Sequence, residues 1–219
     1  MKKKLVIVGG RGSGEIAMSV FQEANRATGE WEIAGFLSDA VEPGGFLGEF
    51  KVLGPSAAVG DFVGNGFHIH YALHFHARHK EERVKKMLSY NIPLEAHASA
   101  VHPRAFVDPS AKVGCGTLIG ALVGTSPGPT IGNFVHIYTG AFIAHDSLVD
   151  HYVTIAANAA VGARVRIREG AHIGLNATVR EEVTVGRYAI VGIGAVVVDD
   201  VPDFAVAVGN PARIIKYLH

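Results

Sequence analysis

The sequence has little cysteine, no excess charge of either sign and no long apolar run. Its one cysteine, Cys115, cannot form a disulfide within the chain, which fits a reducing compartment. Lysine plus arginine and aspartate plus glutamate number 20 each, so no basic excess exists to bind a nucleic-acid backbone. Charged residues make up only 18% of the chain and hydrophobic residues 48%, which excludes a disordered chain and supplies a core.

The beginning of the sequence lacks the pattern of a secretion signal. The apolar run after the first lysines stops after about five residues, short of the ~7–15 residues that such a signal needs. No uninterrupted apolar stretch is long enough to cross a bilayer. We therefore expect a soluble, cytoplasmic protein without a membrane partner.

Residues 1–95 have the pattern of a small α/β domain. Apolar residues at helical spacing predict helices over Glu15–Arg26 and His79–Tyr90. The continuous apolar run Lys4–Gly9 predicts a strand that is buried on both faces. Trp31–Leu37 and Phe67–Leu73 are the second and third predicted strands. The alternation of strands and helices predicts a parallel, Rossmann-like sheet.

A period of six runs through residues 101–202. Seventeen hexads begin here, and 16 of them begin with valine or isoleucine, Thr125 being the exception. The residue four places further on is mostly small. The first positions are Val101, Val107, Val113, Ile119, Thr125, Ile131, Ile137, Ile143, Val149, Ile155, Val161, Ile167, Ile173, Val179, Val185, Val191 and Val197. No helix has this period, so it predicts a solenoid in which each hexad forms a short strand and turns a corner.

With its aliphatic–glycine pairs and its GNPAR segment at 209–213, this part of the chain resembles the hexapeptide-repeat acyltransferases. The pairs are Ile131-Gly132, Val161-Gly162, Ile173-Gly174, Val185-Gly186 and Val191-Gly192. The resemblance implies a left-handed parallel β-helix and a homotrimer with active sites between subunits. We therefore expect a substrate-binding domain over 1–95, a β-helix acyltransferase domain over 96–203 and a tail over 204–219. The proline-rich segment 125–130 keeps the period, although it could distort its coil locally.

Three motifs extend the resemblance over nearly the whole chain. They are GGRGSG at 9–14, VHPRAFVDPSAKVG at 101–114 and TGAFIAHDSLV at 139–149. In this order they are similar to the bacterial nucleotide-sugar acetyltransferases of the bacillosamine and perosamine type and to the sialic-acid O-acetyltransferases. The resemblance implies acetyl transfer from acetyl-CoA to a nitrogen or oxygen of a nucleotide-linked sugar in cell-surface glycan biosynthesis, with no metal.

His145 and Asp146 are the expected catalytic pair. The attacking amine or hydroxyl must lose a proton, and an imidazole can accept it at neutral pH. A carboxylate beside the ring would fix its tautomer and favour its charged form. Adjacency in sequence alone does not determine whether the carboxylate of Asp146 reaches the ring. The resemblance implies the role of general base for His145.

The glycine loop predicts an anion site, because backbone N–H groups and a helix N-terminus would meet there. The expected substrate-binding residues are Gly10, Gly12, Ser13, Asp39 and His74. Ser13 stands where many relatives have histidine, and His74 stands where they often have glycine. For acetyl-CoA, the motifs imply contacts with Thr154, Ala163, Leu175 and Ile193. Thr154 departs from the bacillosamine-type enzymes, which have histidine at the matching place.

Three alternatives stay open. His145 with His136, His151 and His172 raises a γ-type carbonic anhydrase with interfacial zinc, although the spacings match that family poorly. The glycine loop followed by Asp39 could indicate a dinucleotide-binding oxidoreductase, for which the domain is too short. A trimeric binding protein without activity would share the fold.

A further histidine run could bind zinc or form a polar rim. It consists of His68, His70, His74, His76 and His79.

Overall fold

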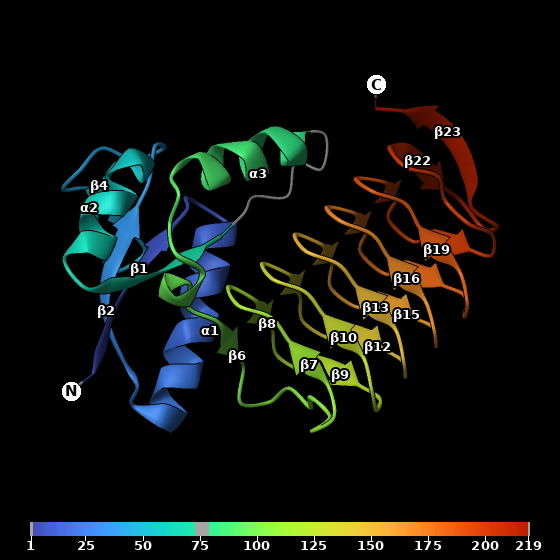
Figure 1. Ribbon diagram of the computed structural model, residues 1–219, viewed down its shortest axis with the longest axis horizontal. Coiled ribbons are helices and arrows are strands. Elements are labelled where there is room, and N and C mark those ends of the chain that lie inside the picture. The colour runs from blue at the N-terminus through green and yellow to red at the C-terminus, as the bar shows by residue number, and fades with distance from the viewer. Residues whose placement is uncertain (1, 73–78, 219) are drawn as a thin grey trace.

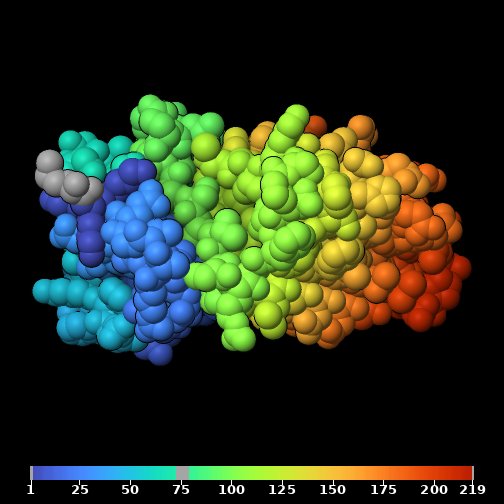
Figure 2. Space-filling view, turned by 90° about the horizontal axis from the view of Figure 1, so that it is seen from below, coloured from blue at the N-terminus to red at the C-terminus, as the bar shows by residue number. Residues whose placement is uncertain are grey.

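The computed structural model describes residues 2–72 and 79–218. An α/β part lies at one end, and the coils of a β-helix follow it in chain order toward the other end (Figures 1 and 2). No helix among the described residues is long and apolar enough to cross a membrane. The fold predicted from the sequence is thus confirmed, with an α/β region first and a parallel β-helix after it.

The α/β part contains a five-stranded sheet in the order β3-β4-β2-β1-β5. All neighbouring pairs are parallel except β3 with β4. The strands are β1 (Lys3–Val8), β2 (Trp31–Leu37), β3 (Phe46–Leu47), β4 (Phe50–Gly54) and β5 (Phe67–Tyr71). The helices are α1 (Ser13–Thr28), α2 (Val59–Gly64) and α3 (Lys80–Ser89), with single 3₁₀ turns η1 (Ser56–Ala58) and η3 (Leu94–Ala96). The sequence predicted β1, β2, β5, α1 and α3, and did not predict β3, β4 or α2.

The β-helix has three sheets of short strands, and each strand pairs in parallel with the strand 18 residues away. The first sheet contains β6 (Ala100–Val101), β8 (Leu118–Ile119), β11 (His136–Ile137), β14 (Thr154–Ile155), β17 (His172–Ile173) and β20 (Ile190–Val191). The second contains β9 (Gly124–Thr125), β12 (Phe142–Ile143), β15 (Ala160–Val161), β18 (Thr178–Val179) and β21 (Val196–Val197). The third contains β7 (Lys112–Val113), β10 (Thr130–Ile131), β13 (Leu148–Val149), β16 (Arg166–Ile167) and β19 (Thr184–Val185).

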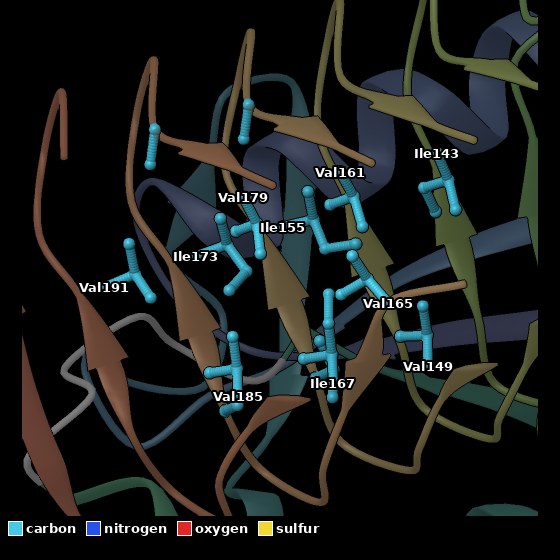
Figure 3. Packing of buried hydrophobic residues seen from close by; sticks show 14 of the residues in the cluster. Ile143, Val149, Ile155, Val161, Val165, Ile167, Ile173, Val179, Val185 and Val191 are labelled. Atoms are coloured by element: carbon cyan, nitrogen blue, oxygen red, sulfur yellow. The ribbon is translucent and has the colours of Figure 1, made fainter. Parts of the chain in front are cut away.

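The first residue of each hexad fills the interior of the β-helix (Figure 3). From Ile119 onward every one of these residues is buried, Thr125 included. The earlier Val101, Val107 and Val113 are not fully buried, because the first coil has a neighbouring coil on only one side. The proline-rich segment does not leave the coil, since β9 and β10 pair with their neighbours in register.

The two ends of the β-helix are closed in different ways. At the C-terminal end, β22 (Ala205–Val208) continues the first sheet and β23 (Arg213–Tyr217) pairs with it antiparallel. At the other end, Leu118 of the first coils packs into the same cluster as Phe21 of α1. Phe134 packs into a second cluster with Met87 of α3. The α/β part and the β-helix therefore share a continuous apolar junction.

Candidate functional site

The imidazole of His145 and the carboxylate of Asp146 are in direct contact at the corner that follows β12. Nδ1 of His145 donates a hydrogen bond of 2.9 Å to Oδ2 of Asp146. Asp146 has a φ of 57°, in the left-handed region that aspartate tolerates better than most residues. The backbone N–H of Asp146 donates to Pro127 of the preceding coil, and the carbonyl of His145 accepts from Arg164 of the next. The coils on both sides thus hold the pair in place.

This geometry suits His145 to accept a proton. With Nδ1–H donating to the carboxylate, the lone pair for proton uptake is on Nε2. The side chain of His145 is 46% exposed and that of Asp146 is 65% exposed. The pair is therefore accessible to a substrate that docks against this corner from outside the β-helix.

A cavity of about 680 Å³ lies at the carboxyl ends of β1, β2 and β5. In an open parallel sheet, ligands bind at this edge, where the strand order reverses. The cavity brings together Gly10, Ser13 and Asp39 of the predicted site. Gly12 lies beside it as the cap of α1, with a φ of 78°. His74 lies outside the described residues.

The glycine loop packs closely on the sheet. A Cβ added to Gly9 would lie 2.9 Å from the Cβ of Ala72 at the end of β5. The hydroxyl of Ser13 donates to the carbonyl of Ala72, and Ser13 is buried. Gly9, Gly10, Arg11 and Ser13, around the N-terminus of α1, line the cavity, and the positive end of a helix is a favourable environment for a phosphate.

Asp39 is the centre of a polar network in the cavity. Its carboxylate accepts hydrogen bonds from the backbone N–H and the hydroxyl of Ser56 and from Nζ of Lys86. The hydroxyl of Ser56 also lies 3.3 Å from that of Tyr90. The Ser56 hydroxyl, helped by Lys86, lowers the pKa of Asp39, so the carboxylate stays ionised at neutral pH.

The sequence did not single out the residues that α3 contributes to this cavity. Arg83, Lys86, Met87 and Tyr90 line it from one side. Their spacing of three or four residues places them on one helix face, and this spacing was the available signal. What the sequence could not show is that α3 turns this face toward the glycine loop.

The residues expected to contact acetyl-CoA lie in different environments. Ala163 is 18 residues after His145 and lies at the same corner, one coil on. Leu175 and Ile193 are exposed at the corner before the β9–β21 sheet. Thr154 is buried, and its hydroxyl accepts a hydrogen bond of 2.7 Å from Nζ of Lys80.

Large apolar side chains are exposed on the β9–β21 sheet and on the corner that leads into it. They are Phe106, Leu122, Phe142, Leu175 and Ile193. We call this set the apolar strip. His145 lies at the corner where β12 leaves the same sheet, and it is not among the residues that line the cavity. Within a single chain, the pair of His145 and Asp146 is therefore not part of the cavity.

The other described histidines lie in different surroundings and form no set of metal ligands. His136 lies on β11, but it is buried rather than at an exposed corner, because the α/β part covers it. His151 lies at another corner, where Nδ1 accepts from the N–H of Asn133. His68 and His70 on β5 pack edge-on against Trp31 and Phe21. Within residues 2–72 and 79–218, no three His, Cys, Asp or Glu side chains are grouped as a metal site would require.

Comparison with known proteins places the chain among characterised relatives. No protein-family model matches it. The acetyltransferase domain of PglB from Neisseria gonorrhoeae FA1090, also solved in complex with acetyl coenzyme A, is 29% identical with a TM-score of 0.84. The match covers 98% of this chain and 100% of that domain. A mutant of GDP-perosamine N-acetyl transferase from Caulobacter crescentus, in complex with CoA and GDP-perosamine, is 28% identical over 97% of both chains, with a TM-score of 0.81.

A curated relative, GDP-perosamine N-acetyltransferase from Escherichia coli O157:H7, is 31% identical over 138 residues. The match covers 62% of this chain and 54% of that protein, so it spans about half of the relative's own length. These similarities confirm the resemblance expected from the motifs. They do not favour the zinc-enzyme alternative.

Proposed function

We propose that this chain, which resembles the hexapeptide-repeat nucleotide-sugar acetyltransferases in sequence and fold, transfers an acetyl group from acetyl-CoA to a nucleotide-linked amino sugar. The observation that carries the proposal is the pairing of Nδ1 of His145 with Asp146 on a β-helix whose fold matches acetyltransferase domains. GDP-perosamine N-acetyltransferase and the PglB domain solved with acetyl coenzyme A support this substrate class and this co-substrate.

In the proposed reaction, the sugar nitrogen or oxygen attacks the thioester carbonyl carbon of acetyl-CoA. Nε2 of His145 accepts the proton that the nucleophile loses, while Asp146 holds the ring and stabilises the imidazolium. The carbon–sulfur bond breaks and the CoA thiolate leaves, to be protonated by the imidazolium or by solvent. We assign the acetyl-CoA contacts to Ala163, Leu175 and Ile193, and keep Thr154 as a weaker candidate because it is already bound to Lys80.

The cavity in the α/β part suits the nucleotide of the substrate. The N-terminus of α1, with Gly10, Gly12 and Ser13, would receive the diphosphate. Arg83 and Lys86 on the opposite wall add positive charge, and ionised Asp39 would accept hydrogen bonds from the nucleoside. We propose the predicted domains in the predicted roles: residues 1–95 hold the nucleotide sugar, residues 96–203 carry catalysis, and residues 204–219 form a tail.

A homotrimer would bring the two halves of the site together. Several large apolar side chains exposed on one face are typical of an interface, and the apolar strip lies on and beside the sheet from which the corner with His145 departs. Burial of the strip against another copy would give His145 a partner surface that the chain alone lacks. Three copies follow from the resemblance, and we place the reaction in the cytoplasm, where acetyl-CoA is available.

Thermal unfolding with a panel of ligands tests the proposal. Ligands that bind the native state raise the unfolding midpoint by mass action. We expect shifts with acetyl-CoA and CoA, and with one of the UDP-, GDP-, CMP- or dTDP-sugars. No shift with any CoA species, together with a shift for zinc or NAD alone, would contradict the proposed function.

A further inference from the structure

A lysine is buried at the start of α3. Lys80 is only 4% exposed, and its Nζ donates a hydrogen bond of 2.7 Å to the hydroxyl of Thr154 on β14. None of the ion pairs among the described residues includes Lys80. A buried ammonium with a neutral partner lacks the compensation that buried charges normally have.

The surroundings of Lys80 are basic. Thr154 pairs in register with His136 on one side and His172 on the other. Burial lowers the pKa of both imidazoles, and the charge of Lys80 lowers each of them further. His70 of β5 stacks on His136, with ring centres 5.3 Å apart. None of these groups can neutralise an ammonium.

Near this part of α3, no carboxylate among the described residues pairs with Lys80: Glu82 lies beside His79 with its side chain 80% exposed, and two others are bound to cations. Glu81, the next residue of the helix, pairs with Lys85 at 2.8 Å. Glu169, at a corner of the β-helix, pairs with Arg187 and accepts a hydrogen bond from the hydroxyl of Tyr188. Burial therefore lowers the pKa of Lys80 to about 7, from its ordinary value of 10.5.

Lys80 is linked through α3 to the cavity. Arg83 and Met87, which line the cavity, follow Lys80 by three and seven residues and thus lie on the same helix face. Met87 also packs with Phe134 of the β-helix. A displacement of the start of α3 from Thr154 would therefore move the cavity wall.

We propose that Lys80 is a positioning residue, whose neutral amine fixes α3 on the β-helix as a wall of the cavity and whose protonation releases that wall. While α3 is packed on the β-helix, the buried amine of Lys80 resists protonation, whereas in a detached α3 the amine is in water and has its ordinary pKa. Between about pH 10.5 and 7, each unit by which the pH falls therefore raises the ratio of detached to attached helix about tenfold. Below pH 7 the amine is protonated in both forms, and Lys80 adds no further pH dependence. Burial lowers the pKa values of the neighbouring His70, His136 and His172, which therefore titrate below this window.

Hydrogen exchange of the intact wild-type protein, read by mass spectrometry between about pH 7.5 and 9.5, tests this proposal. Intrinsic amide exchange rises in proportion to hydroxide concentration. In α3 the fraction of detached helix falls by the same factor, so we expect exchange there to be independent of pH. Exchange in α1 of the same sample is the internal control and should rise with hydroxide.

Two variants make the test specific. Lys80→Met keeps the length of the side chain and removes the titrating group, so exchange in α3 should regain the rise that α1 shows. Lys85→Arg, on the same helix but exposed, keeps the ion pair with Glu81 and should leave the pH-independence of α3 intact. A proportional rise in wild-type α3, or pH-independent exchange that persists in Lys80→Met, would overturn the proposal. If Lys80→Met does not fold, the wild-type comparison of α3 with α1 still decides.

The coupling to the cavity rests on the proposed function and is measured separately, by hydrogen exchange of α3 at about pH 7.5 with and without UDP or GDP, after calorimetry has shown which of them binds. A nucleotide whose affinity needs the attached wall lowers the fraction of detached helix, so exchange in α3 should slow by a factor that grows with nucleotide concentration. Exchange in α3 that does not change when a bound nucleotide saturates the protein would overturn the coupling. If neither nucleotide binds while the exchange result holds, the role of Lys80 in fixing α3 stands and the proposed function loses its support from the cavity.

Discussion

Replacement of His145 by alanine should abolish most of the activity and leave the fold intact. The side chain is 46% exposed, and its one side-chain hydrogen bond is to Asp146, which is 65% exposed. Its removal leaves no core cavity, so we expect the free energy of unfolding to change by no more than about 0.5 kcal/mol. A positioned general base contributes about 10²–10⁴-fold to rate, and we expect kcat to fall by this factor.

The assay should separate acetyl-CoA from CoA by chromatography, because Cys115 is partly exposed and would consume a thiol reagent. His151→Ala is the matched control. His151 occupies the same hexad position as His145 at the next corner, so its removal should leave turnover close to wild type. Near-normal turnover in a correctly assembled His145→Ala protein would refute the assignment of the general base.

Three further outcomes follow from the described contacts. Ile155→Ala should lower the free energy of unfolding by about 2–5 kcal/mol, because a fully buried side chain is lost between stacked coils, and an unchanged urea midpoint would contradict this packing. Asp39→Asn should weaken nucleotide binding about 10- to 100-fold in calorimetry, because an ionised acceptor is lost, and equal affinity would exclude Asp39 from the site. Burial lowers the pKa of His70 and His172 to about 4, so the unfolded chain binds protons that the native state does not. Stability should therefore fall as pH drops from about 6.5 to 4, and urea midpoints of wild type and His172→Asn should show a smaller pH slope in the variant.

The β-helix could be predicted from the sequence because its constraint repeats. Each hexad must place one aliphatic residue inside, so the interior positions can be recognised in the sequence by an aliphatic residue every six positions. The backbone conformation at the corners was harder to predict from the sequence. Leu122, Phe134, Asp146 and Tyr152 all adopt a positive φ, and no shared residue type marks that position. The contact between His145 and Asp146 depends on this corner conformation, which sequence adjacency did not reveal.

The α/β part was predicted where its elements are long and periodic. The short strands β3 and β4 and the helix α2 escaped because two to six residues carry too little periodicity. The burial of His136 depends on the α/β part that covers the first sheet, a contact that the period of six does not show. The bond between Lys80 and Thr154 joins residues 74 positions apart, so local pattern cannot show it.

The most direct test of the central claim is the product of the reaction itself. The purified protein is incubated with acetyl-CoA and each member of a panel of nucleotide-linked amino sugars, and mass spectrometry follows the sugar and the CoA together. The proposed function predicts that one sugar gains an acetyl group while CoA is released in equal amount. Acetyl-CoA that stays intact with every member of the panel, in protein that binds neither CoA nor any nucleotide sugar, would contradict it.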